Sequence, residues 1–123
     1  MDGIVILTVK EPYASYLVDG LKTWEIRKRP VRYRGDVVIV TGGRAIGRVR
    51  LVDVLGPFDL DKLSKFQALH RADPEFLREY AAGNRLFAWV MQAPERFDKP
   101  IPVEIIRRFE GPLRYGRLIR TPD

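Results

Sequence analysis

Apolar residues along the chain fall into short runs that are separated by glycine and proline. Runs of strand length that are rich in β-branched residues predict five β-strands, at residues 4–9, 37–40, 45–55, 86–91 and 102–109. Residues 114–123 carry a weaker pattern. Residues 22–28 alternate instead, with Trp24 and Ile26 on one face and polar side chains on the other. Because successive side chains of a strand point to opposite faces, this predicts a sixth strand with Trp24 in the core.

Three segments have the pattern of short helices. Pro12 suits the first turn of a helix, and the apolar stripe that follows it stops before Gly20, a residue type that often follows a helix end. Asp59 is expected to cap a second helix that extends to Leu69, and Asp73 marks the start of a third.

The order of these elements favours a small barrel over a doubly wound sheet. Strands and helices alternate too irregularly for repeated strand-helix-strand units. No repeat, low-complexity segment or linker divides the chain, and 123 residues is a usual size for one domain. We therefore predict an α+β, β-rich fold. It is a single domain over residues 1–123, built as a small mixed β-barrel of five to six strands with two to three short helices.

Composition argues against several classes of protein. Apolar residues make up 46% of the chain, and no apolar run approaches the roughly 18 residues of a membrane helix. The apolar run near the N-terminus is too short for a signal peptide, so we expect a soluble, cytoplasmic protein, taken as a monomer, without membrane contact. There is no cysteine and a single histidine, His70, so no metal or cofactor is expected. His70 itself is expected to be a capping or surface residue near a helix end.

Positive charge is concentrated in one segment of the chain. The formal net charge is +6, and residues 27–50 contain eight basic residues against one acidic residue, Asp36. Such clustering is expected where a protein contacts a polyanion, so RNA or DNA is the predicted partner. The side chains expected to contact its phosphate backbone are Arg29, Arg32, Arg34, Arg44, Arg48 and Arg50. Most basic residues are arginine and few residues are Asn, Gln or Met, which leans toward a thermophile.

A short motif marks the candidate site. Gly20, Lys22, Glu25 and Arg27 form the pattern Gly-x-Lys-x-x-Glu-x-Arg. Glu25 and Arg27 are two apart on one predicted strand, so their side chains share a face, whereas Lys22 needs a turn beside Gly20 to join them. The two cations suit phosphate or base edges, and the carboxylate suits an exocyclic amine or a ribose hydroxyl. The alternative is that Glu25 and Arg27 simply pair with each other on a solvated strand.

This motif resembles the signature of the ASCH domain, a PUA-like family, and it is complete here. The similarity extends upstream through residues 7–15 and covers residues 4–105 in all. The resemblance implies a PUA-like barrel whose motif lines a cleft for RNA or a nucleotide. The expected cleft residues are Tyr13, Lys22, Glu25 and Arg27, with Tyr13 at the helix start placed to stack on a base.

The same resemblance leaves an enzymatic alternative open. Some relatives are amidohydrolases of acetylated cytidine-type nucleosides, in which the motif lysine acts with a threonine at the position of Glu25 and a glutamate from the helical insertion. Here Glu75 or Glu79 would have to supply that glutamate, and Lys22 and Glu25 are the catalytic candidates. A glutamate neighbour is expected to raise the pKa of Lys22, which favours binding over catalysis. A ribonuclease and a protein-interaction module are two further alternatives.

Overall fold

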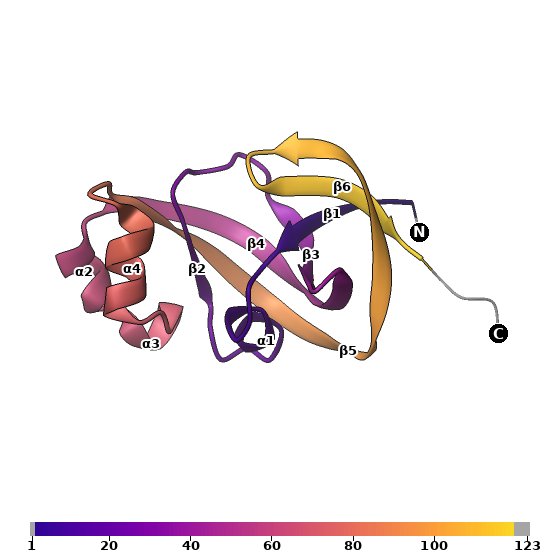
Figure 1. The fold of residues 1–123 in the computed structure, drawn as a ribbon, viewed down its shortest axis with the longest axis horizontal. Helices are drawn as coiled ribbons and strands as arrows, with labels where there is room; N and C mark the ends of the chain where they lie inside the picture. The colour runs from indigo at the N-terminus through magenta and orange to yellow at the C-terminus, as the bar shows by residue number, and fades with distance from the viewer. Residues whose placement is uncertain (1, 120–123) are drawn as a thin grey trace.

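The computed structural model describes residues 2–119, which form six β-strands and four short helices (Figure 1). In chain order the elements are β1 (Asp2–Thr8), α1 (Tyr13–Val18), β2 (Trp24–Arg27), β3 (Gly35–Thr41), β4 (Arg44–Phe58), α2 (Leu60–Ser64), α3 (Gln67–His70), α4 (Pro74–Ala81), β5 (Leu86–Glu110) and β6 (Leu113–Leu118). The predicted α+β, β-rich class is confirmed, with four helices in place of two to three. No helix in this part of the chain is long and apolar enough to span a bilayer.

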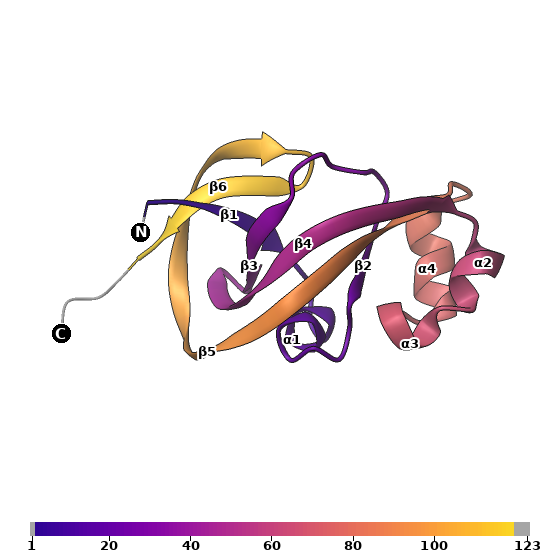
Figure 2. The same ribbon diagram turned by 180° about the vertical axis from the view of Figure 1, so that it is seen from behind.

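The strands form one mixed sheet in the order β2-β5-β4-β3-β1-β6. β1 and β3 pair in parallel, and the other pairings are antiparallel. A further pairing between β6 and the last part of β5 closes the sheet into a barrel-like ring (Figures 1 and 2). β2 pairs with the first part of β5 and lies at the open edge of the sheet, between the ring and the helices α2 to α4.

The apolar core has three parts: one that includes α1, one under the helices α2 to α4, and a smaller one in which Ile6 of β1 packs with Val38 of β3. The first part contains the fully buried Trp89 of β5 together with Leu7 of β1 and Ile39 of β3. In the second part, Trp24 of β2 packs with Leu63 of α2 and other apolar residues of the helices. Trp24 is 8% exposed, which confirms its expected place in the core. The helical segment therefore stays attached to the barrel through β2.

β5 is one strand of 25 residues where the sequence predicted two shorter ones. Pro94 and Pro100 lie within it, and proline cannot donate a hydrogen bond to a neighbouring strand. Pro94 and Pro100 fall where the pairing with β4 shifts register, so the strand passes them as bulges and continues, while a third proline, Pro102, lies opposite Arg44. The first part of the weaker pattern at residues 114–123 corresponds to β6, which pairs with both β1 and β5, and residues 120–123 lie outside the described part of the chain.

The segment predicted as one helix, residues 60–69, forms two. α2 ends at Ser64 and α3 begins at Gln67, with Phe66 between them in a non-helical conformation. The ring of Phe66 lies 4.9 Å from that of Trp24, between ring centroids. Burial of this aromatic side chain therefore outweighs the continuation of the helix, a tertiary contact that local pattern does not reveal.

Candidate functional site

The turn between α1 and β2 positions Lys22. Gly20 follows α1 with a φ of 77°, a left-handed conformation that suits glycine. The N–H of Lys22 then donates to the carbonyl of Tyr16, and the N–H of Thr23 donates to the carbonyl of Leu69, both at 3.0 Å. β2 begins after Thr23, so strand alternation does not apply to Lys22. The expected turn is present and brings the lysine to the rest of the motif.

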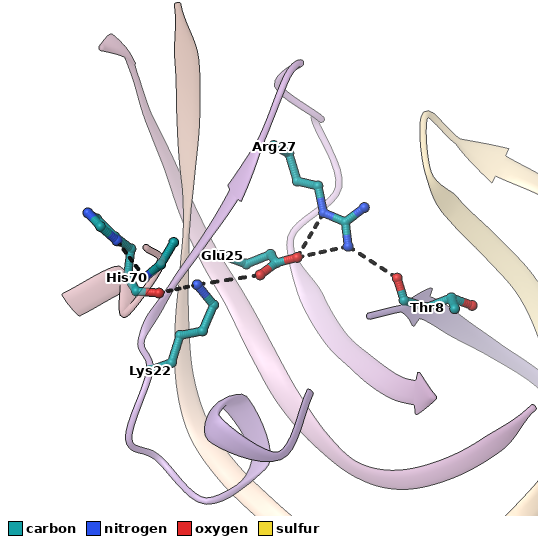
Figure 3. A network of polar contacts seen from close by, with 6 residues as sticks. Thr8, Lys22, Glu25, Arg27 and His70 are labelled. Atoms are coloured by element: carbon teal, nitrogen blue, oxygen red, sulfur yellow. Dashed lines mark hydrogen bonds and ion pairs between the residues drawn. The ribbon is translucent and has the colours of Figure 1, made fainter. Parts of the chain in front are cut away.

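Glu25 lies at the centre of a chain of polar contacts (Figure 3). Its Oε2 accepts a hydrogen bond from Nε of Arg27 at 2.9 Å, and Nη2 of the same guanidinium lies 2.8 Å away. Its Oε1 lies 3.7 Å from Nζ of Lys22, which also donates to the backbone carbonyl of His70. Arg27 in turn donates to the carbonyl of Thr8 at 3.1 Å. The motif thus links the helical segment to the end of β1.

Burial changes the protonation chemistry of Lys22. Its side chain is 2% exposed, and its ammonium lies between the carboxylate of Glu25 and the backbone carbonyl of His70. Burial lowers the pKa of Lys22, and the Glu25 carboxylate raises it by a smaller amount. The sequence-based expectation that Glu25 would raise this pKa above its ordinary value was therefore wrong. The carboxylate acts in the expected direction, but loss of hydration has the larger effect.

A cavity of about 450 Å³, called the motif cavity below, lies beside this network. Its lining includes the four predicted cleft residues, Tyr13, Lys22, Glu25 and Arg27. Further lining residues that the motif did not indicate are Thr8, Lys10, Thr41, Phe76 and Tyr80. Among the described residues, its charged lining groups are three cations and one carboxylate, which favours a ligand that carries negative charge.

Aromatic side chains of α1 and α4 form one wall of the motif cavity. The rings of Phe76 and Tyr80 are stacked, with centroids 5.9 Å apart and an interplanar angle of 10°. Tyr13 lies 5.5 Å from Phe76 and carries the Lys22 ammonium 5.3 Å above its ring. Burial also raises the pKa of Tyr80, which keeps its hydroxyl protonated. Because Phe76 and Tyr80 are four residues apart on a helix, their spacing was the signal that could have indicated this wall.

Two comparisons with known proteins agree on the family and the fold. The model of the ASCH domain family matches residues 7–101. The chain belongs to the ASCH domain family. Among solved structures, the ASCH protein from Zymomonas mobilis aligns with a TM-score of 0.71 at 21% identity, covering 80% of this chain and 72% of that one. Two single-residue variants of it align similarly, with TM-scores of 0.69 and 0.70 at 22% identity, covering 80% of this chain and 74% and 72% of theirs.

A third comparison found no match among curated proteins. The likeness to the Zymomonas mobilis structures supports the PUA-like barrel of this ASCH domain and concerns the fold alone. The site is therefore argued below from its own geometry.

None of the six arginines predicted to contact phosphate lines the motif cavity. Arg29, Arg32 and Arg34 lie on the connection between β2 and β3, whereas Arg44 lies at the other end of β3, at the start of β4. A strand of seven residues spans about 20 Å, so these two groups are well separated. The remaining two lie along β4 in exposed ion pairs, at 3.0 Å between Arg48 and Glu95 and 3.3 Å between Arg50 and Asp36.

His70 is fully buried, so the expectation of a surface residue was wrong. Its Nε2 lies 2.8 Å from the carbonyl of Leu63, and its Nδ1 accepts the N–H of Ala72 at 3.0 Å, just beyond α3. The ring therefore satisfies backbone groups around the helix end, as a capping residue does. Glu75 and Glu79 of α4, the two glutamates considered for catalysis, are exposed and do not line the motif cavity.

Proposed function

We propose that the motif cavity binds one nucleotide of an RNA strand. The observation that carries this proposal is the presence of a charged network and an aromatic wall in the lining of one cavity. The polar contacts of Lys22, Glu25 and Arg27 and the stacked rings of Phe76 and Tyr80 all belong to this lining. A nucleotide presents the complementary groups, because it combines a flat apolar base with hydrogen-bonding edges and a negative phosphate.

Each part of the motif cavity has a role in this proposal. The rings of α4 stack on the base, a contact that contributes about 1–3 kcal/mol in single-strand binding. Glu25 accepts a hydrogen bond from an exocyclic amine or a ribose hydroxyl, while Arg27 and Lys10 attract the phosphate. Glu25 is held rigidly by its two cationic neighbours, so its position is set before a ligand enters.

Binding of the four ribonucleoside monophosphates, followed by NMR chemical shifts and calorimetry, tests the proposal. Phe76→Leu keeps an apolar side chain but removes a ring, and we expect it to weaken binding about tenfold. Glu25→Gln is expected to change the order of preference among the bases, because it replaces an acceptor by a mixed donor and acceptor. Phe97→Leu, which removes a partly buried ring outside the motif cavity, is the matched control. The proposal would be refuted if addition of the nucleotides caused no chemical-shift changes at the motif residues.

An amidohydrolase of an acetylated cytidine-type nucleoside is the second candidate. It is favoured by the lowered pKa of Lys22, because a neutral amine is the nucleophilic form of lysine. It is disfavoured by the absence of Glu75 and Glu79 from the cavity lining, since Glu25 is then the one carboxylate among the described lining residues. Incubation with acetylated cytidine and mass detection of released acetate decides between the two. Turnover that Lys22→Ala abolishes would establish the enzyme, and no turnover would exclude it for this substrate.

A ribonuclease is the weakest of the alternatives. General acid-base cleavage of RNA most often uses a histidine, and the single histidine of the chain is buried outside the cavity lining with both ring nitrogens engaged.

A further inference from the structure

The end of the β5–β6 hairpin and the connection between β2 and β3 meet on a surface outside the motif cavity (Figures 1 and 2). The carboxylate of Glu110, at the end of β5, accepts hydrogen bonds from the N–H groups of Arg32 at 2.6 Å and Tyr33 at 3.0 Å. The ring of Tyr33 also contacts that of Phe109, with centroids 5.3 Å apart. We call this region the hairpin surface and define it by Arg32, Tyr33, Arg107, Arg108, Phe109, Arg114 and Tyr115.

Positive charge on the hairpin surface is not balanced by neighbouring carboxylates. Arg108 and Arg114 are direct partners across the antiparallel β5–β6 pairing, an arrangement of like charges that is destabilising. Among the described residues, no carboxylate lies within ion-pair distance of either side chain or of Arg107. Arg114 donates instead to the carbonyls of Gly111 and Leu113, so its replacement needs the stability control given below. The nearby Glu110 is occupied by two backbone N–H groups. A polyanion would supply the missing negative charge.

Aromatic rings lie beside Arg107, on the face of the hairpin opposite to Arg108 and Arg114. Phe109 is 39% exposed, and its ring is stacked near that of Tyr115, with centroids 6.1 Å apart. The guanidinium of Arg107 lies 4.6 Å from the centroid of the Tyr115 ring. An exposed ring with arginines nearby suits a single-stranded nucleic acid, because a base stacks on the ring while the cations bind phosphates.

We propose that the hairpin surface is a second contact site for single-stranded RNA. Arg108 and Arg114 bind phosphates on one face of the hairpin. The strand passes over the hairpin end, where Arg32 binds a further phosphate, and a base stacks on Phe109 on the other face. This proposal rests on the proposed function, from which it takes RNA as the ligand. It goes beyond that function because it assigns binding to residues outside the motif cavity. It also predicts a dependence on length, since a single nucleotide occupies the cavity and a longer strand reaches both sites.

Fluorescence anisotropy with a labelled 12-nucleotide oligouridine tests the proposal, with uridine monophosphate as the probe of the motif cavity. Arg108→Ala combined with Arg114→Ala is expected to weaken oligonucleotide binding at least tenfold. It should also reduce the slope of log K against log salt by about 1.4, because each phosphate contact on a single strand contributes about 0.7. Binding of the monophosphate should not change.

The matched control is Arg78→Ala combined with Arg85→Ala. This variant removes the same charge from exposed positions on α4 and beyond it, at the helical end of the molecule. We expect it to bind the oligonucleotide within threefold of the wild type. Phe109→Leu retains apolar packing against its neighbours but not the ring, and a loss of about five- to tenfold is expected. An unchanged thermal unfolding midpoint would establish that each variant is folded.

The proposal would be overturned if the Arg108 and Arg114 variant bound the oligonucleotide as tightly as the control variant does. The exposed Ile105 and Ile106, at 49% and 53%, offer the other use of this surface, an interface between two copies of the chain. A dimer that Ile106→Glu dissociates, together with unchanged RNA affinity, would also overturn it. If the monophosphate fails to bind while the Arg108 and Arg114 variant still loses oligonucleotide affinity, the cavity proposal fails and this one stands.

Discussion

Glu25 is a buried carboxylate that faces two cations, Lys22 and Arg27. Glu25→Gln keeps the shape of the side chain but leaves the buried ammonium of Lys22 without its counter-charge. Removing one partner of a buried ion pair is strongly destabilising, because the remaining charge stays out of water. We expect the free energy of unfolding at pH 7, measured by urea denaturation, to fall by roughly 3 kcal/mol.

The control for this prediction is a carboxylate in an exposed ion pair. Glu104 lies 3.2 Å from Arg117, and both side chains are about half exposed. Glu104→Gln should change the free energy of unfolding by no more than about 0.5 kcal/mol, since water already screens this pair. Equal effects of the two substitutions would show that Lys22 does not depend on Glu25.

Lys22 itself provides a second prediction, on its titration. Burial lowers its pKa below 10.5, and the carboxylate of Glu25 opposes that shift. Glu25→Gln should therefore lower the pKa of Lys22 further, which NMR titration of the lysine Cε and Nζ resonances measures directly. A pKa that rises in the variant would contradict this account of the site.

The same shift has a consequence for stability. Because the folded pKa of Lys22 is the lower one, the unfolded chain binds this proton more tightly. The cost of burying the charged lysine is therefore present at neutral pH. It is relieved as the pH rises through the window between the folded pKa and 10.5.

At the scale of elements, His70 connects the segment of α2 to α4 with Lys22 of the motif through hydrogen bonds. Its ring joins the carbonyl of Leu63 in α2 to the N–H of Ala72 before α4, and its own carbonyl accepts from Lys22. Nδ1 acts as the acceptor for Ala72, so a proton there would oppose an N–H donor. Burial lowers the pKa of His70, and the positive charge of Lys22 acts in the same direction.

Stability should consequently fall in mild acid. With its folded pKa below 6.5, His70 is neutral in the native state, and the unfolded chain takes up the proton first. The contribution of neutral His70 to the free energy of unfolding is fully present above pH 6.5. It is lost as the pH falls from 6.5 toward the folded pKa of His70. Urea denaturation at pH 7.5 and 5.5 measures the change, and His70→Gln should show a smaller difference between the two. An equal pH dependence in that variant would assign the effect to other groups.

The elements near the motif could be predicted from sequence because their signals are local. The alternation around Trp24 located β2, and Gly20 located the end of α1. The contributions of Phe76, Tyr80 and His70 could not be predicted from the motif, because they depend on how the segment between β4 and β5 packs against β2. The spacing of Phe76 and Tyr80 indicates a shared helix face, but the packing that turns this face toward the motif joins residues about 50 positions apart and is not revealed by periodicity.

At the scale of the whole molecule, clustering of charge in the sequence does not equal clustering in space. The basic residues of 27–50 are divided between β2 with the β2–β3 connection and β4, where two of the three arginines are in ion pairs. The contacts of Glu110 instead bring Arg32 beside arginines that lie more than 70 positions later in the chain. The nucleic-acid surface that we propose is therefore assembled by the closure of the ring.

Salt dependence tests this distribution of charge as a whole. Affinity for the 12-nucleotide RNA should fall steeply as salt rises, because each arginine bound to a phosphate displaces condensed counterions. Arg29→Ala combined with Arg32→Ala suits the test better than a change at Arg34, whose guanidinium donates to the carbonyls of Val31 and Tyr33 and so supports the loop.

The Arg29 and Arg32 variant should weaken binding to all sequences by a similar factor and reduce the salt slope by about 1.4, since phosphate contacts position a strand without reading its bases. Glu25→Gln should do the reverse, altering base preference while leaving the slope unchanged. Affinity that stays flat with salt would refute the phosphate contacts. If base preference also shifted in the arginine variant, the assignment of backbone contact to one set of residues and base contact to the other would be wrong.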